Sequence, residues 1–200
     1  MRQETKGVTE SLLESAKKEF LEYGFYNASL RRISSESGVS TNSIYTRFGD
    51  KSGLFNAIVE DAANGLMKIY NESIDEASNC DNAFSAVNSG DEGTEIVLKY
   101  IYDNFDAFKL IFCSSSGTEY EDYFDKLAET EEKYYKEFVK QYANENCNIS
   151  DFFIHVVCRT GWQYIYELVS HNISYEEAKA FMKNIREYRF AGWKKILGLI

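Results

Sequence analysis

The residues best suited to chemistry form a short polar series in the first quarter of the chain. The series consists of Ser40, Thr41, Asn42, Ser43 and Arg47. Hydroxyl and amide side chains donate to and accept from base edges, and an arginine is long enough to reach a guanine or a phosphate. These residue types at helical spacing therefore predict contacts with the bases of DNA.

The stretch 29–48 has the proportions of a helix-turn-helix that would hold this series in place. Ser29 is a candidate N-cap of a helix of about eight residues, and Gly38 is suited to end it. Ser40 then caps a second short helix, in which Ile44 faces inward and the polar side chains face outward. A helix presented in this way fits the major groove, which is about 12 Å wide.

Phosphate contacts are predicted at the ends of these helices. Tyr45 and Lys51 lie near the end of the second helix and the start of the next, whose N-terminus is positive. Ser29 and Arg31 are candidates at the first helix. For Arg31 and its neighbour Arg32, the alternative is a merely solvated side chain.

Composition and charge indicate an all-α protein with two different parts. Proline is absent from all 200 residues, although roughly ten would be expected at average usage, so nothing prevents helices along the whole chain. The net charge is −10. Residues 1–60 carry equal numbers of acidic and basic side chains, so the excess acid lies in the remainder, and contacts with a polyanion must come from the N-terminal part.

The sequence also excludes several functional classes. The longest apolar run, residues 152–158, is too short to span a bilayer. Four widely spaced cysteines without a secretory signal are typical of a reduced, cytoplasmic protein. No phosphate-binding loop, dinucleotide fingerprint, nucleophile elbow or zinc-like spacing is present, so we expect no cofactor, no metal and no enzyme activity.

The N-terminal segment resembles the DNA-binding signature of the TetR family of bacterial transcriptional regulators. The matching residues are Ile33, Gly38, Val39, Ser40, Tyr45, Phe48, Lys51 and Leu54, with Ala16, Phe20 and Gly24 upstream. Ser34 and Asn42 depart from the alanine and the glycine or proline that are usual there, and Asn42 leaves the base preference open.

The resemblance implies a fold and a mechanism. It implies a three-helix DNA-binding domain over residues 1–51 and a helical effector-binding and dimerisation domain over residues 52–200, with about nine helices in all. It further implies a repressor that binds a palindromic operator on double-stranded DNA as a homodimer and is released by a small ligand. The alternatives are a regulator controlled by a protein partner and, as a poor second, an all-helical enzyme.

Within the C-terminal part, residues 78–94 are polar and rich in turn-forming residues, which predicts a loop with a short apolar patch. Helical periodicity resumes at Ile96. The body beyond is rich in aromatic rings, which by default form its core but can also line a cavity for a small apolar or aromatic effector. The candidate cavity residues are Phe105, Phe108, Phe112, Tyr123, His155, Arg159, Trp162 and Gln163, with a dimer seam or the surface as the alternative place for the polar ones.

The last two predicted helices each carry an apolar stripe that suits a dimer interface. The stripe residues are Phe153, Val157, Gly161, Tyr164 and Leu168 in the first, and Phe181, Ile185, Tyr188, Gly192 and Ile196 in the second. Gly161 and Gly192 disfavour the middle of a helix, so we expect close helix–helix approach to compensate for them.

Overall fold

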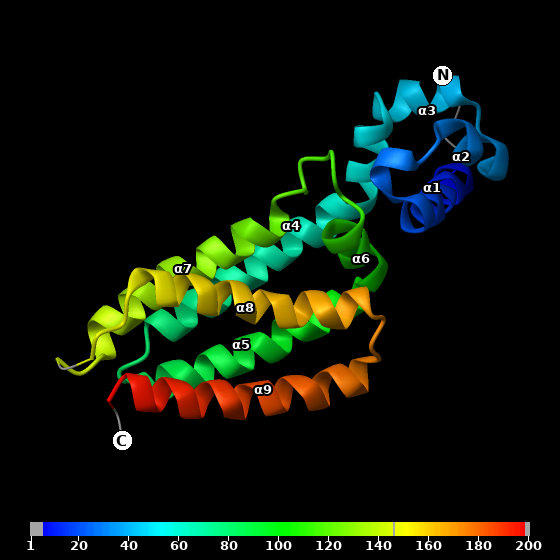
Figure 1. Ribbon diagram of the computed structural model, residues 1–200. Coiled ribbons are helices and arrows are strands. Elements are labelled where there is room, and N and C mark those ends of the chain that lie inside the picture. The colour runs from blue at the N-terminus through cyan, green and yellow to red at the C-terminus, as the bar shows by residue number, and fades with distance from the viewer. Residues whose placement is uncertain (1–5, 146, 199–200) are drawn as a thin grey trace. The chain divides into compact units, whose positions relative to one another are not determined.

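The computed structural model describes residues 6–145 and 147–198, and this part of the chain contains helices and no strands (Figure 1). Residues 1–5 of the first predicted domain therefore lie outside the described residues, as do residues 146, 199 and 200 of the second. The helices are α1 (Lys6–Asn27), α2 (Leu30–Ser37), α3 (Thr41–Phe48), α4 (Lys51–Ser78), α5 (Ala83–Asp103), α6 (Phe105–Cys113), α7 (Tyr123–Tyr142), α8 (Asp151–Ser170) and α9 (Tyr175–Ile196). The all-α fold expected from the composition is confirmed.

The chain divides into two compact units. The first combines residues 6–64 with residues 104–123, and the second combines residues 65–103 with the described residues from 124 onward. Helix α4 is continuous through the division. The boundary predicted at residue 51 divides the chain by function, into a DNA-binding and an effector-binding domain, whereas the two units are defined by packing. The functional boundary stays a prediction.

The first unit is built around the buried faces of α1, α3 and the first half of α4. Phe20 and Phe55 are fully buried, and their rings meet edge to face with centroids 5.2 Å apart. Helix α1 is interrupted at Gly24, whose φ of 70° suits glycine, and continues to Asn27. Just beyond it, the Phe25 amide donates to the Ser114 carbonyl at 2.9 Å and joins α1 to the end of α6.

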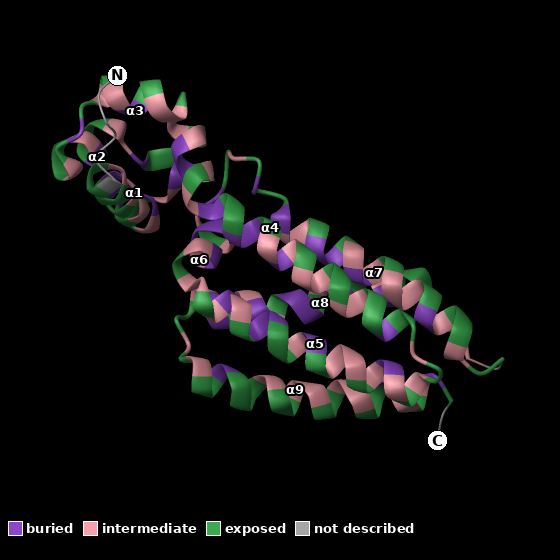
Figure 2. Cartoon of the chain, turned by 180° about the vertical axis from the view of Figure 1, so that it is seen from behind, coloured by how far each residue is buried: buried purple, intermediate pink, exposed green. Residues whose placement is uncertain are grey.

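The second unit consists of the second half of α4 with α5, α7, α8 and α9. Helices α5 and α9 lie side by side (Figure 1). In Figure 2, α9 is coloured almost entirely as exposed or intermediate, and only Ala178 and Trp193 of this helix are buried. The face of α9 that turns away from the unit is therefore open to solvent in a single chain.

The predicted loop over residues 78–94 is wrong in its second half, because α5 already begins at Ala83. The Asn82 side chain accepts a hydrogen bond from the Ser85 amide at 2.9 Å, which caps the new helix. Further on, a Cβ atom at Gly93 would lie 2.8 Å from the Ser73 Cβ of α4. The absence of a side chain at Gly93 allows α5 to pack closely against α4, whereas the sequence alone suggests a turn at this residue.

Among the described residues, none of the helices has both the length and the apolar character that crossing a bilayer requires.

Candidate nucleic-acid interface and cavity

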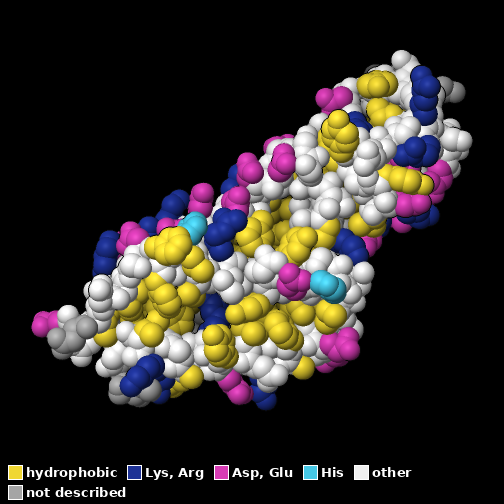
Figure 3. All heavy atoms as spheres, viewed as in Figure 1, with side chains coloured by type: hydrophobic (Ala, Val, Ile, Leu, Met, Phe, Trp, Pro, Cys, Tyr) yellow, Lys and Arg dark blue, Asp and Glu magenta, His cyan; other side chains and the backbone are white. Residues whose placement is uncertain are grey.

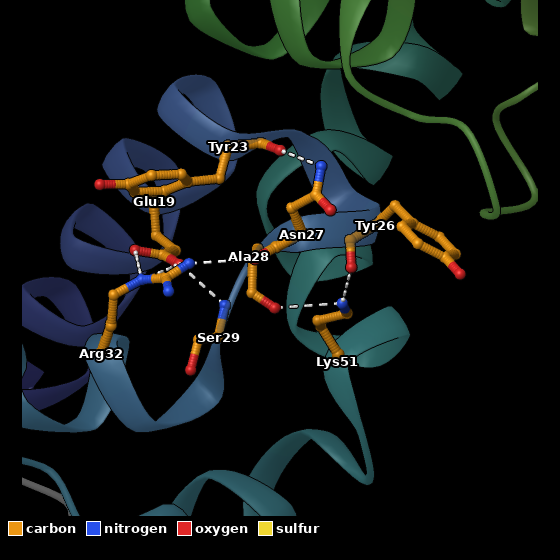
Figure 4. A network of polar contacts seen from close by, with 8 residues as sticks. All are labelled: Glu19, Tyr23, Tyr26, Asn27, Ala28, Ser29, Arg32 and Lys51. Carbon is orange, nitrogen blue, oxygen red and sulfur yellow. Dashed lines mark hydrogen bonds and ion pairs between the residues drawn. The ribbon is translucent and has the colours of Figure 1, made fainter.

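The start of α2 is fixed by a buried carboxylate of α1. Ser29 has extended dihedrals, as an N-cap should, but its side chain makes no capping hydrogen bond. Its backbone amide instead donates to Glu19 Oε1 at 2.7 Å (Figure 4). The same carboxylate accepts from Arg32 Nε at 2.8 and 3.0 Å. Glu19 thus holds the first turn of α2 on α1, a role that the sequence reasoning missed because α1 shows no motif around this residue.

The turn between α2 and α3 is set by a glycine and two hydroxyls. Gly38 is in the left-handed region with φ 69°, and the Ser37 hydroxyl accepts from the Val39 amide at 3.2 Å. Ser40 caps α3 by accepting from the Ser43 amide, also at 3.2 Å. The predicted helix-turn-helix is therefore present. The observed end of α2 and the observed start of α3 each lie within one residue of the predicted positions.

Helix α3 has one buried side and one open side. Ile44 is fully buried, whereas Ser40 and Asn42 are exposed and Thr41 and Ser43 are half-buried. Tyr45 retains 53% of its surface. Five of the predicted DNA-binding side chains are thus exposed or half-buried at the start and middle of α3.

Arg47, at the end of α3, is tied back to α1. Its Nη1 donates to Thr9 Oγ1 at 2.7 Å. Since a guanidinium has five donor hydrogens in a rigid fork, this bond fixes the orientation of the side chain and leaves donors for another acceptor. Thr9 was not among the predicted site residues.

Lys51 closes the C-terminal end of α1. Its ammonium donates to the Tyr26 carbonyl at 3.0 Å and to the Ala28 carbonyl at 3.1 Å (Figure 4), and it lies 4.7 Å from the centre of the Phe25 ring. Partial burial lowers the pKa of Lys51. Arg31, in contrast, is exposed and forms no ion pair with the described residues.

A cavity of about 140 Å³ lies within the second unit and is lined by residues of α4, α5, α7, α8 and α9. Its wall is mostly apolar and aromatic. The aromatic side chains are Tyr70, Tyr134, Tyr135, Phe138, Trp162, Phe190 and Trp193. The rings of Tyr135 and Trp193 stack with centroids 4.9 Å apart.

An ion pair forms one polar part of this wall. Arg189 Nη2 of α9 donates to Glu131 Oε1 of α7 at 3.1 Å and to the Tyr135 hydroxyl at 3.3 Å. Burial raises the pKa of Glu131, although the positive charge of Arg189 opposes this effect. Gly161 gives the pair its room, because a Cβ there would lie 3.1 Å from Arg189 Nη1.

The structure distributes the predicted cavity residues over three places, and of these only Trp162 lines the cavity. His155, Arg159 and Gln163 line a shallow surface hollow on α8, where each meets an acidic partner: Glu132 at 2.9 Å, Asp125 at 2.6 Å and Glu167 at 2.7 Å. Phe105, Phe108, Phe112 and Tyr123 belong to the first unit. Phe108 is fully buried against Phe112, and the Tyr123 hydroxyl donates to the Ala63 carbonyl at 2.7 Å.

For these residues the aromatic periodicity reflects core packing, as it most often does. The cavity residues Glu131 and Arg189 escaped sequence reasoning because they lie 58 positions apart. The one available signal was Gly161, for which the sequence predicts a close helix–helix approach. The structure shows that Gly161 packs against Glu131 and Arg189 of the same chain.

The predicted dimer stripes divide by exposure. Phe153, Phe181, Tyr188 and Gly192 are exposed, Val157, Tyr164, Ile185 and Ile196 are half-buried, and Gly161 and Leu168 are buried. The last two are corrections, since Leu168 and Gly161 are covered by the chain's own packing and have no surface for a partner. Figure 3 shows hydrophobic side chains gathered over α8 and α9 of the second unit.

The fold and the open face of α3 define an all-helical protein with an N-terminal helix-turn-helix. Residues 12–58 match the family model described as bacterial regulatory proteins of the tetR family. The N-terminal segment of this chain is thus similar to that family over residues 12–58.

Two curated relatives are HTH-type transcriptional repressors named AcnR. The repressor of Corynebacterium glutamicum is 33% identical over 64 residues, which cover 32% of this chain and 34% of that protein. The repressor of Corynebacterium efficiens is 33% identical over 81 residues, which cover 36% of this chain and 43% of that protein. The chain thus spans between a third and a half of the length of these two repressors.

Solved structures extend the likeness of fold to most of the chain. PfmR, a TetR-family regulator from Thermus thermophilus, has a TM-score of 0.62 at 17% identity over 88% of this chain and 97% of PfmR. SCO3833, a TetR-family member from Streptomyces coelicolor A3, also has a TM-score of 0.62, at 19% identity over 88% of this chain and 87% of SCO3833.

Proposed function

We propose that this chain is a transcriptional repressor that binds a palindromic operator as a homodimer and releases it when a small ligand enters the cavity of the second unit. The observation that carries the proposal is the open polar face of α3, whose opposite side is anchored by the fully buried Ile44. The family match over residues 12–58 supports the same function.

In this proposal the open face of α3 enters the major groove. Thr41, Asn42 and Ser43 lie in the first turn, where a recognition helix contacts base edges. Arg47 keeps its bond to Thr9 and directs its remaining donors to a guanine or a phosphate. The exposed hydroxyl of Tyr45 suits a phosphate contact.

Three more side chains would bind the DNA backbone. Lys51 donates two of its three hydrogens to the carbonyls of Tyr26 and Ala28, which leaves one hydrogen for a phosphate. Arg31 is exposed, and the Ser29 hydroxyl makes no capping bond. These contacts would set the register of the protein without reading sequence.

The homodimer is supported by apolar surface on α8 and α9. Phe153 retains 40% and Phe181 38% of its surface, and Tyr188 retains 71%. Tyr164 of α8 and Phe181 of α9 meet edge to face with centroids 6.0 Å apart, so the two helices present one continuous face. A two-fold dimer through this face would bury it and would provide two α3 helices for two half-sites.

Release by a ligand is supported by helix α4. This helix begins at Lys51, directly after α3, and it supplies Tyr70, Ser73 and Ala77 to the cavity wall. A ligand that shifts α4 would change the distance between the two α3 helices from the 34–36 Å that successive major grooves require. The cavity also favours a small ligand over a protein partner as the effector. A regulator controlled by a protein partner would need no cavity, and its second unit could be fully packed.

Selection of bound duplexes from a random DNA library, with the purified full chain, tests the proposal. We expect enrichment of a palindrome whose half-sites are centred one helical turn apart, about 10–10.5 base pairs, or a multiple of it. A library that stays random after selection, or enrichment of an unpaired single site, would contradict the proposal.

A further inference from the structure

We propose that the ligand of the second-unit cavity is a compact, uncharged and mostly apolar molecule that carries one hydrogen-bond-accepting oxygen for Trp162 and Arg189. This inference rests on the proposed function, because it gives the chemical class of the regulator's effector.

The size of the cavity sets the size of the ligand. Its volume is about 140 Å³, and an apolar protein cavity of about 150 Å³ holds a molecule such as benzene. Apolar side chains from four helices, among them Ala86, Val97, Ile165 and Met182, line the cavity together with the aromatic rings. A single ring or a short branched chain therefore matches the space, and its burial in apolar surroundings supplies most of the affinity.

Two buried donors on this wall have no acceptor. Trp162 is 4% exposed, and neither its Nε1 nor Arg189 Nε meets an acceptor with hydrogen-bonding geometry among the described residues. Burial raises the pKa of Tyr70, and the Trp162 indole is near enough to the Tyr70 hydroxyl to oppose that shift, but this hydroxyl lacks the geometry of a hydrogen bond to Nε1. Both Trp162 and Arg189 line the wall of this one cavity. A buried donor without a partner costs about 1–3 kcal/mol, and an oxygen with two lone pairs in the ligand would satisfy both.

The charges around the cavity argue for a neutral ligand. Glu131 pairs with Arg189 at 3.1 Å, and Asp91 pairs with Arg186 at 3.5 Å. Each lining acidic group thus faces a basic group, and the wall has no spare charge. An ionic ligand would bring an unpaired charge into a site where desolvation is costly.

The test uses four probes of nearly equal size and shape: acetophenone, benzoate, 1-phenylethylammonium and cumene. Binding of each to the full chain without DNA is titrated by ligand-observed NMR. We expect acetophenone to bind about three- to tenfold more tightly than cumene, as one or two net hydrogen bonds would give, and both ions to bind more weakly than acetophenone. Equal affinity for acetophenone and cumene, tighter binding of either ion, or no binding of acetophenone would overturn the inference.

Two variants test whether the preference for acetophenone over cumene comes from the Trp162 Nε1 donor. Trp162→Phe removes the Nε1 donor and keeps a ring, so the preference for acetophenone over cumene should fall by at least half. Trp193→Phe is the matched control, because it removes a second indole from the same wall and Trp193 Nε1 is not among the orphaned donors. A preference that survives Trp162→Phe unchanged would overturn the inference, and circular dichroism checks that both variants are folded.

The readouts separate the two proposals. If acetophenone binds as expected but an enriched operator is not released, the ligand class holds and the ligand-release part of the proposed function fails. If the operator is bound but no probe in the series prefers an acceptor, the repressor stands and the inference on the ligand fails.

Discussion

The carboxylate of Glu19 accepts hydrogen bonds from Arg32 Nε at 2.8 and 3.0 Å while its Oε1 also accepts from the Ser29 amide. Glu19 is 6% exposed, whereas the Arg32 side chain is half exposed. Solvent screens the ion pair on the Arg32 side, so the stabilising part of the arrangement is the buried carboxylate on the amide that begins α2.

Glu19→Ala should therefore destabilise the first unit. The Ser29 amide loses its acceptor, and a buried unsatisfied donor costs about 1–3 kcal/mol. Urea unfolding followed by circular dichroism measures this loss. Glu10→Ala, at an exposed position of the same helix, is the control and should change the free energy of unfolding by less than about 0.5 kcal/mol. Equal effects of both variants would contradict the role given to Glu19.

The stability contributed by Glu131 should fall as pH rises. Because burial raises the folded-state pKa of this carboxyl above its ordinary 4.5, its contribution is fully present below pH 4.5 and is lost as pH rises through the raised value. The free energy of unfolding of the wild type minus that of Glu131→Gln, measured in urea at several pH values, should decrease over this window.

The neighbouring Glu132 provides a control of opposite sign. Hydrogen bonds from Lys136 and then from His155 lower the pKa of Glu132. Its contribution is therefore present above pH 4.5 and is lost as pH falls through the lowered value. The same difference for Glu132→Gln should rise with pH, and two parallel curves would refute both assignments.

Arg47→Ala should change base preference. If its free donors contact a guanine, removal costs about 1–3 kcal/mol at one position of each half-site and makes that position indifferent to sequence. Library selection with the variant measures this. The Thr9→Val variant keeps the arginine but removes its anchor, so it should weaken the same preference only in part. An unchanged selected sequence for Arg47→Ala would exclude a base contact.

Lys51→Ala should weaken binding to all sequences alike. A phosphate contact carries no sequence information, so the slope of log affinity against log salt should fall by about one. Fluorescence anisotropy over a salt series gives the slope. Lys68→Ala, also in α4 but with 76% of its side chain exposed and paired with Glu72, should leave the slope unchanged; a loss of slope there would indicate a general effect of charge.

Phe181→Glu should convert the proposed homodimer into a monomer. A charge in the middle of an apolar interface is left unpaired and desolvated, whereas in the monomer the residue is already 38% exposed and tolerates it. Light scattering after size exclusion measures the mass, and operator affinity should fall with it. Ile96→Glu, at a position on α5 with 52% exposure, is the control and should leave the dimer intact.

Much of the helix-turn-helix was predictable because its signals are local. Gly38 and Ser40 end and begin helices through their own backbone freedom and hydroxyl, within four residues of where they act. The alternation of Ile44 with polar neighbours fixes which side of α3 is open. Such features depend on a few consecutive residues, so they are legible in the chain itself.

The cavity was not predictable in the same way. Phe108 and Trp162 have the same aromatic character and helical setting, yet Phe108 is packed in the core of the first unit while Trp162 lines the cavity of the second. Likewise α5 begins at Ala83 in a segment whose composition favours turns, and Gly93 within this helix packs closely against Ser73 of α4.

The sequence by itself thus determined the all-helical class, the helix-turn-helix and the accessible face of α3, since these follow from residue type and short-range spacing. Only the tertiary structure decided that Glu19 holds α2, that Glu131 meets Arg189, and that two donors on the cavity wall lack acceptors. Those relationships join residues from different helices, and the distance between such residues is fixed by packing of the whole unit, not by any local pattern.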